Sequence, residues 1–157
     1  MTALANGNLL IASALDNTIT EVDTSGATVA GGVNFTIDAA FLDREQRGVP
    51  VGIAYSHIDT VLILTSRSFE VVEFDLVGNE LSSLDVGQFG MTLPAGLAID
   101  PVTGNLFVSD DFRGSNRIYE VTPARQELVV EGEPRLGDLV AIIDPSTEFG
   151  IDDPEGL

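Results

Sequence analysis

The sequence repeats itself with a period of about 45 residues, and this repeat restricts the fold more than any other feature. Segments 7–26, 60–79 and 104–125 share an apolar run, a short polar turn and a second run in which apolar and polar residues alternate. One glutamate of each segment falls in the same register: Glu21, Glu73 and Glu120. Alternation with a period of two is typical of β-strands, so the repeat predicts an all-β chain.

A second register opens each unit with an apolar run after proline, at Pro50, Pro94 and Pro154. Residues 100–105 then supply the proline, glycine and asparagine that a short hairpin loop requires. Each unit therefore predicts three to four short antiparallel strands. Such a unit, recurring every ~45 residues, is typical of a β-propeller blade rather than of a helical solenoid.

The repeat units predict one β-propeller segment without further domains. Their approximate bounds are 1–49, 50–93 and 94–153, with the start of a further unit at 154–157. This amounts to about three and a half four-stranded repeats, whereas propellers have about 4 to 8 blades, so we expect an incomplete ring. Either the chain is a segment of a longer polypeptide, or two or more copies complete a ring.

The spacing between the repeats predicts further elements. A capping Asp38, helix-forming residues and the pair Asp43 and Arg47 predict a helical turn or two over 38–48. Fourth strands are expected at 80–86 and 127–131. The second of these begins a long connection, and one more strand follows it near 139–143.

The register glutamates alternate with apolar residues along the third strand of each unit. Val22, Phe74 and Val121 fall on one face of that strand, and Glu21, Glu73 and Glu120 fall on the other. We interpret the glutamates as the exposed polar face of a half-buried sheet rather than as a ring of ligands.

Charge and hydropathy exclude several classes of function. The 157 residues hold 7 basic and 25 acidic side chains, a formal net charge of -18. Such a chain repels phosphate backbones, so a nucleic-acid partner is not expected. The longest apolar runs, at 61–64 and 139–143, are far shorter than the ~20 residues that span a bilayer, so membrane insertion is not expected either.

Motifs for covalent catalysis are missing from the sequence. It holds no cysteine, no Gly-x-Ser-x-Gly elbow and no phosphate-binding loop with its lysine. The one histidine, His57, lies in a predicted turn and is interpreted as a solvent-exposed turn residue.

Acidic side chains form two clusters that could bind a hard cation. Asp110 and Asp111 precede Asn116, and the second cluster contains Asp144, Asp152, Asp153 and Glu155. Oxygen ligands of this kind suit Ca²⁺, although the spacing of an EF-hand loop is absent. Two interpretations stay open: solvated acidic loops and a calcium site.

Residues 94–123 closely resemble the NHL-type and related YWTD-like propeller repeat, with its Pro-x-Gly strand, its Asp-x-x-x-Gly-Asn turn and its Asn-Arg-Ile strand. Residues 149–157 look like the opening of a blade in the SdiA-regulated and esterase-like-phytase groups of bacterial propellers. The resemblance implies that Glu155 begins an innermost strand, where such proteins hold a divalent metal. Glu155 is the best match to such a ligand, and Asp110 is a weaker one. The resemblance also favours an extracellular or periplasmic location.

Three hypotheses of function follow. The first is a non-enzymatic scaffold or binding segment of a longer protein, which contacts a protein or small-molecule ligand through loops 110–116 and 132–153. The second is a metal-dependent hydrolase of the gluconolactonase or esterase-like-phytase type. The third is a homo-oligomer that completes its own propeller ring. No cofactor other than Ca²⁺ is indicated.

Overall fold

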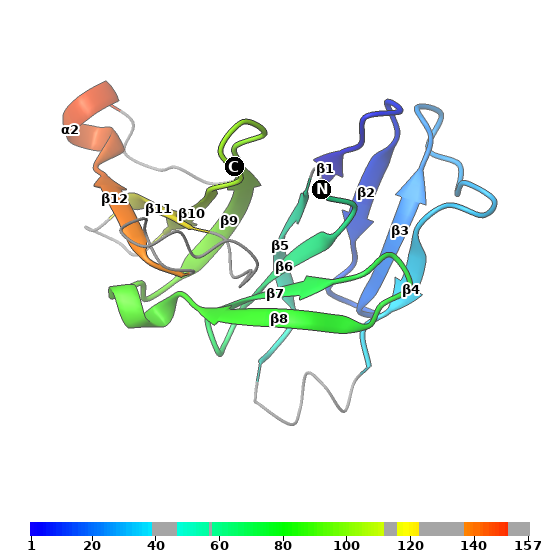
Figure 1. The fold of residues 1–157 in the computed structure, drawn as a ribbon, viewed down its shortest axis with the longest axis horizontal. Helices are drawn as coiled ribbons and strands as arrows, with labels where there is room; N and C mark the ends of the chain where they lie inside the picture. Colours follow the sequence, from blue (N-terminus) through cyan, green and yellow to red (C-terminus); the bar gives the residue numbers. More distant parts are fainter. Residues whose placement is uncertain (39–46, 57, 112–115, 123–136, 151–157) are drawn as a thin grey trace.

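The protein is described by a computed structural model, which covers residues 1–38, 47–56, 58–111, 116–122 and 137–150. Within these residues the strands form three four-stranded antiparallel sheets, each built from consecutive strands. The sheets lie side by side as an arc, with the first at the right and the third at the left of Figure 1. Each sheet is one blade of a β-propeller, and together they make an incomplete ring.

Every blade has the strand order expected of a simple meander. Blade 1 contains β1 (Thr2–Ala3), β2 (Leu9–Ala12), β3 (Thr18–Val22) and β4 (Asn34–Thr36). Blade 2 contains β5 (Pro50–Tyr55), β6 (Val61–Thr65), β7 (Glu70–Phe74) and β8 (Glu80–Asp85). Blade 3 contains β9 (Pro94–Ile99), β10 (Leu106–Asp110), β11 (Arg117–Val121) and β12 (Leu139–Ile143).

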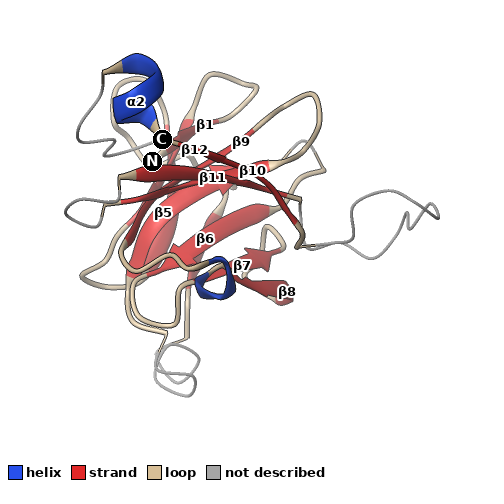
Figure 2. Cartoon of the chain, turned by 90° about the vertical axis from the view of Figure 1, so that its left-hand side faces the viewer, coloured by secondary structure: helices blue, strands red, loops and turns tan. Residues whose placement is uncertain are grey.

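Helices are short in the part of the chain that the model describes, as Figure 2 shows. A 3-10 turn, η1 (Gly87–Phe89), connects blades 2 and 3, and α2 (Pro145–Phe149) follows β12. Neither these nor any other described helix is long and apolar enough to cross a membrane.

The first strands of the blades meet one another at the inside of the arc. β5 contacts both β1 and β9, whereas the fourth strands lie on the outside. Gly52 in β5 allows this approach, because a Cβ there would lie 3.0 Å from the Cβ of Leu97 in β9. The blades therefore radiate from a common centre, which is the arrangement of a propeller.

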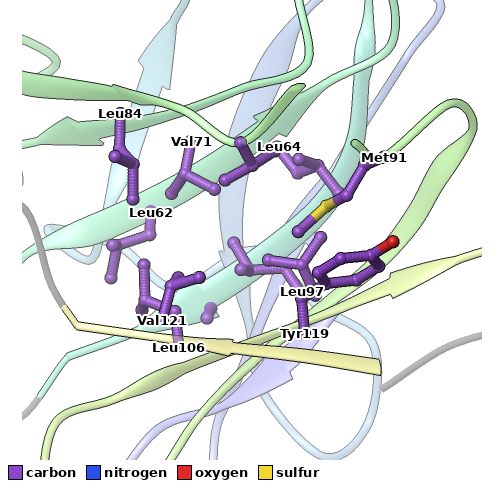
Figure 3. Close-up of a cluster of buried hydrophobic side chains, with 12 residues drawn as sticks. Leu62, Leu64, Val71, Leu84, Met91, Leu97, Leu106, Tyr119 and Val121 are labelled. Atoms are coloured by element: carbon purple, nitrogen blue, oxygen red, sulfur yellow. The ribbon is translucent and has the colours of Figure 1, made fainter. Parts of the chain in front are cut away.

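Two hydrophobic clusters hold the three blades together. One lies between blades 2 and 3 and contains the side chains labelled in Figure 3: Leu62, Leu64, Val71, Leu84, Met91, Leu97, Leu106, Tyr119 and Val121. The other lies between blades 1 and 2 and includes Leu10, Ile19, Phe35, Ile53, Val61, Ile63, Val72 and Phe74. The rings of Phe35 and Phe74 lie 5.8 Å apart across this second interface.

Strand β6 contributes to both clusters. Val61 and Ile63 face blade 1, and Leu62 and Leu64 face blade 3. A strand that is covered on both faces must be apolar throughout, which explains the unbroken run 61–64 in the sequence.

The sequence predicted most strands of blades 2 and 3. The expected hairpin at 100–105 is confirmed: the amide of Asp100 donates to the carbonyl of Asn105, and Gly104 has a positive φ of 78°. The fourth strand expected at 80–86 is β8, and the strand expected near 139–143 is β12.

Three expectations fare differently. The fourth-strand position of blade 3, assigned from sequence to 127–131, is occupied by β12, which pairs with β11; residues 127–131 lie outside the described residues. The helix expected over 38–48 also falls largely outside them. The sequence of blade 1 lacks the Pro-x-Gly strand with which the other two blades open, yet the two-residue strand β1 occupies that position and pairs with β2.

Candidate functional site

The three register glutamates are hydrogen-bonded within their own blades, which corrects the expectation that they form an exposed polar face. Glu21 and Glu73 are only 5% and 6% exposed, and Glu120 is partly exposed. Each accepts a hydrogen bond from the residue that immediately precedes the second strand of its blade. The donors are Asn8 to Glu21 at 2.7 Å, Thr60 to Glu73 at 2.7 Å and Asn105 to Glu120 at 2.8 Å.

Strand register explains why the same pair forms three times. Glu21 lies opposite Leu10, Glu73 opposite Leu62, and Glu120 opposite Phe107. The donor is always two residues before this opposite residue, which is the diagonal neighbour on the same face of an antiparallel pair. The glutamates thus face the next blade, and that blade buries the first two of them.

Glu21 has the fullest set of partners. Its Oε1 accepts from the amides of Asn6 and Asn8, and its Oε2 accepts from the backbone amide of Val33 at 2.9 Å. These hydrogen bonds, that of Asn8 foremost, lower the pKa of Glu21 below its ordinary value. Gly32 makes room for the carboxylate, since a Cβ there would lie 2.6 Å from Oε2.

Glu73 ends a chain of hydroxyl groups. Thr60 donates its one hydroxyl hydrogen to Glu73, so in the 2.7 Å contact between Ser56 Oγ and Thr60 Oγ1 the donor is Ser56. Ser82 donates to the other oxygen of Glu73 at 2.8 Å. The Glu73 carboxylate therefore has a structural role as a hydrogen-bond acceptor on the face of blade 2 that blade 3 covers.

Asp110, a sequence-predicted metal ligand, is 1% exposed at the end of β10. Its carboxylate accepts hydrogen bonds from the backbone amides of Thr92 and Leu93, in the segment that leads into β9. The adjacent Asp111 is partly exposed, and its backbone amide donates to the carbonyl of Leu93. Both residues thus tie β10 to the connection between blades 2 and 3.

The second predicted acidic cluster is described only at Asp144. This side chain caps α2, accepting from the amides of Ser146 and Thr147 and from the Ser146 hydroxyl. The Ser146 hydroxyl is the main reason that the pKa of Asp144 is lowered. The other predicted ligands, Asp152, Asp153 and Glu155, lie outside the described residues, as does His57. Nowhere in the described ranges do three or more His, Asp or Glu side chains gather closely enough to hold a metal ion.

Turn aspartates account for further negative charge. Asp23, Asp75 and Asp100 each follow a strand and accept hydrogen bonds from the residues of the turn. The side chains of Ser25, Asn79 and Thr103, respectively, are the largest cause of the lowered pKa of each. These carboxylates stabilise hairpin loops.

Arg47, which the sequence pattern paired with Asp43 in an expected helical turn, is a buried charge. It is 6% exposed, and its Nε lies 2.8 Å from Glu70 Oε2 while its Nη2 lies 3.3 Å from Glu80 Oε1. Ser68 also donates to Glu70 at 2.7 Å. No local pattern could have revealed these ion pairs, because Arg47 and its partners are 23 and 33 residues apart in sequence.

Tyr55 and Asp59 close the first hairpin of blade 2. The Tyr55 hydroxyl donates to Asp59 Oδ1 at 2.6 Å. This hydrogen bond, followed by burial and by the charges of Asp59 and Glu21, raises the pKa of Tyr55 to about 12. The contribution of Glu21 reflects the packing of blade 1 against blade 2.

No family model and no curated protein matches this sequence. Among solved structures, a protein of unknown function from Bacteroides caccae is similar, with 17% identity and a TM-score of 0.59 over 92% of this chain and 45% of that one. Virginiamycin B lyase from Staphylococcus aureus is also similar. Its selenomethionine-substituted form has 17% identity and a TM-score of 0.51, and a catalytically inactive variant with quinupristin has 18% identity and a TM-score of 0.50.

The two lyase structures are each matched over 77% of this chain and 36% of their own length. The lyase is a β-propeller, so the likeness agrees with the three radiating sheets. This chain therefore has the β-propeller fold, and it spans less than half the length of the solved structures that it matches.

Proposed function

We propose that the chain is a non-enzymatic, extracytoplasmic β-propeller segment, which acts as a scaffold and binding surface. The observation that carries the proposal is the repeated carboxylate: in each blade it accepts a hydrogen bond from a side chain of its own blade. A carboxylate held in this way organises a sheet rather than a substrate.

The other described acidic groups support the same function. Asp110 accepts hydrogen bonds from backbone amides in the connection between blades 2 and 3, and Asp144 caps a helix. Asp75 and Asp100 accept hydrogen bonds within turns. If these carboxylate oxygens bound a metal ion instead, the amide and hydroxyl groups that donate hydrogen bonds to them would lose their acceptors. The proposal therefore assigns the described carboxylates to the stability of the blades.

Calorimetric titration of the full chain with Ca²⁺ tests the proposal. We expect only weak, salt-sensitive binding, as for any surface with a net charge of -18. The outcome that favours a metal-dependent hydrolase is a stoichiometric site of micromolar affinity that is lost in Glu155→Gln. Glu148→Gln, an exposed residue of α2, is the matched control and leaves the titration unchanged.

A further inference from the structure

Blade 3 has an apolar face on the side turned away from blade 2. Strand pairing places Phe107 between Ala98 and Glu120 on this face, and Ile118 beside Ile143. The residues of this face that remain partly exposed define what we call the open face of blade 3: Ala98, Phe107, Ile118, Glu120, Ala141 and Ile143. Ser109 and Gly96, on the same face, are buried.

The equivalent positions in blades 1 and 2 are covered by the next blade. Leu10 and Leu62, which lie opposite the register glutamates as Phe107 does, are 0% and 5% exposed. Ile19 and Val71, equivalent to Ile118, are 0% and 2% exposed. The open face of blade 3 thus has the composition of an interface between blades, without the blade that covers it among the described residues.

Blade 1 presents the other half of such an interface. The side of β2 and β3 turned away from blade 2 carries Leu9, Ile11 and Thr20. Leu9 and Thr20 are partly exposed, and Ile11 is 39% exposed. In blade 2 the equivalent residues Val61, Ile63 and Val72 pack against blade 1. One chain therefore carries both complementary faces, one at each end of the arc (Figure 1).

We infer that the open face of blade 3 binds the corresponding face of blade 1 in a second copy of this chain. Because each copy offers both faces, two copies joined head to tail form two identical interfaces and close a ring. The similar protein from Bacteroides caccae is matched over 45% of its length, so two copies of this chain contain about as many residues as that protein. This inference rests on the fold and does not depend on whether the protein binds metal.

Charge gives the association a characteristic salt dependence. Each chain carries a net charge of -18, so two copies repel each other at low ionic strength, and added salt screens this repulsion. The contact itself is mainly apolar, and salt does not weaken it. We therefore expect the dimer to be favoured by high salt.

Sedimentation velocity and light scattering of the full chain in 0.15 M and 1 M NaCl test the inference. The expected mass is twice the 16.6 kDa of one chain. Phe107→Arg and Ile11→Arg each bury a charge in the interface, and each raises the dimer dissociation constant at least about 100-fold. Val102→Arg, which alters an apolar residue that is 89% exposed in the first turn of blade 3, leaves the mass unchanged. Far-ultraviolet circular dichroism and thermal melts confirm that each variant is folded.

A mixture of the two interface variants separates head-to-tail binding from other arrangements. When Phe107→Arg and Ile11→Arg chains are combined, one of the two interfaces is formed by unaltered faces, so mixed dimers form with intermediate affinity. A wild-type chain that stays monomeric at all concentrations overturns the inference. So does Ile11→Arg behaving as wild type, since blade 1 would then not take part, and so do masses that grow beyond two copies, since the ring would not close.

Discussion

Thr60 donates its hydroxyl hydrogen to the buried carboxylate of Glu73, with 2.7 Å between Oγ1 and Oε1. The same diagonal contact joins Asn8 to Glu21 and Asn105 to Glu120. Two different donor types, threonine and asparagine, occupy one position of the repeat. What the blades share is therefore the acceptor and its register, because the geometry of the first hairpin brings any short polar donor within reach of that carboxylate.

Replacing Glu73 by alanine removes the carboxylate that accepts hydrogen bonds from two hydroxyl groups on the face of blade 2 that blade 3 covers. We expect Glu73→Ala to lower the free energy of unfolding by about 2–3 kcal/mol, since Thr60 and Ser82 lose a charged partner in a site shielded from water. Glu120→Ala is the matched control when both variants are measured on the monomeric chain. Glu120 occupies the same register, but there it is partly exposed and water can replace its carboxylate, so the expected loss is about 1 kcal/mol or less. Urea denaturation measures both. Equal losses of unfolding free energy in the two variants would show that the burial of Glu73 by blade 3 contributes nothing to stability.

Arg47 and Glu70 form an ion pair that crosses the sheet from a connection between blades. Because both side chains are largely shielded from water, we expect Arg47→Ala and Glu70→Ala each to destabilise the protein by about 2 kcal/mol, with a coupling energy of about 1 kcal/mol or more in a double-mutant cycle. Arg67→Ala, a change to a nearby arginine, is the comparison for a loss of positive charge alone. Strictly additive losses would contradict the pairing.

Asp110 holds the segment that enters blade 3. In Asp110→Ala the backbone amides of Thr92 and Leu93 lose their acceptor, so their hydrogen exchange is expected to speed up by about tenfold or more relative to amides in the centre of β6. The change is expected whether or not Ca²⁺ is present. Suppose that, without Ca²⁺, Asp110→Ala left exchange at Thr92 and Leu93 unchanged, and that Ca²⁺ slowed exchange at these amides in the wild type. Asp110 would then act as a metal ligand instead.

Tyr55 offers an optical measure of the first hairpin of blade 2. Its pKa of about 12 lies above the ordinary value of 10.0, mainly because the phenol donates to Asp59. The folded state therefore gains stability that is complete below pH 10 and is lost as the pH rises toward 12. In Asp59→Asn the phenolate absorbance should develop at lower pH than in the wild type. Comparing the two proteins cancels the absorbance of Tyr119.

Glu21 gives the protein an acid-sensitive contribution to stability. Its folded pKa is lowered from 4.5 by Asn8, Val33 and Asn6, so the stabilisation is complete well above 4.5 and is lost as the pH falls through the folded value. Glu21→Gln cannot titrate. We expect the unfolding free energy of this variant to depend less on pH below 4.5 than that of the wild type, as measured by urea denaturation in acid. Parallel pH profiles would contradict the role of Glu21.

The order of the strands could be predicted because it depends on local pattern. The alternation around Glu73, the turn at 100–105 and the apolar run of β12 each describe a few neighbouring residues. The interpretation of the register glutamates failed because alternation shows which residues share a face but not what covers that face. In blades 1 and 2 a neighbouring blade covers it, and hydrogen-bond donors that lie up to 15 residues away make the burial of a carboxylate tolerable.

Sequence pattern alone is enough to predict that this chain is all-β, repeats about every 45 residues and forms an incomplete set of propeller blades. Hydrophobic periodicity and turn chemistry are sufficient for that, since they act within a single blade. The folded chain is needed to see that Glu21 and Glu73 are buried acceptors, that Arg47 pairs with Glu70, and that Phe107 lies on the open face of blade 3. These properties arise where one blade packs against the next, through contacts between residues far apart in the chain.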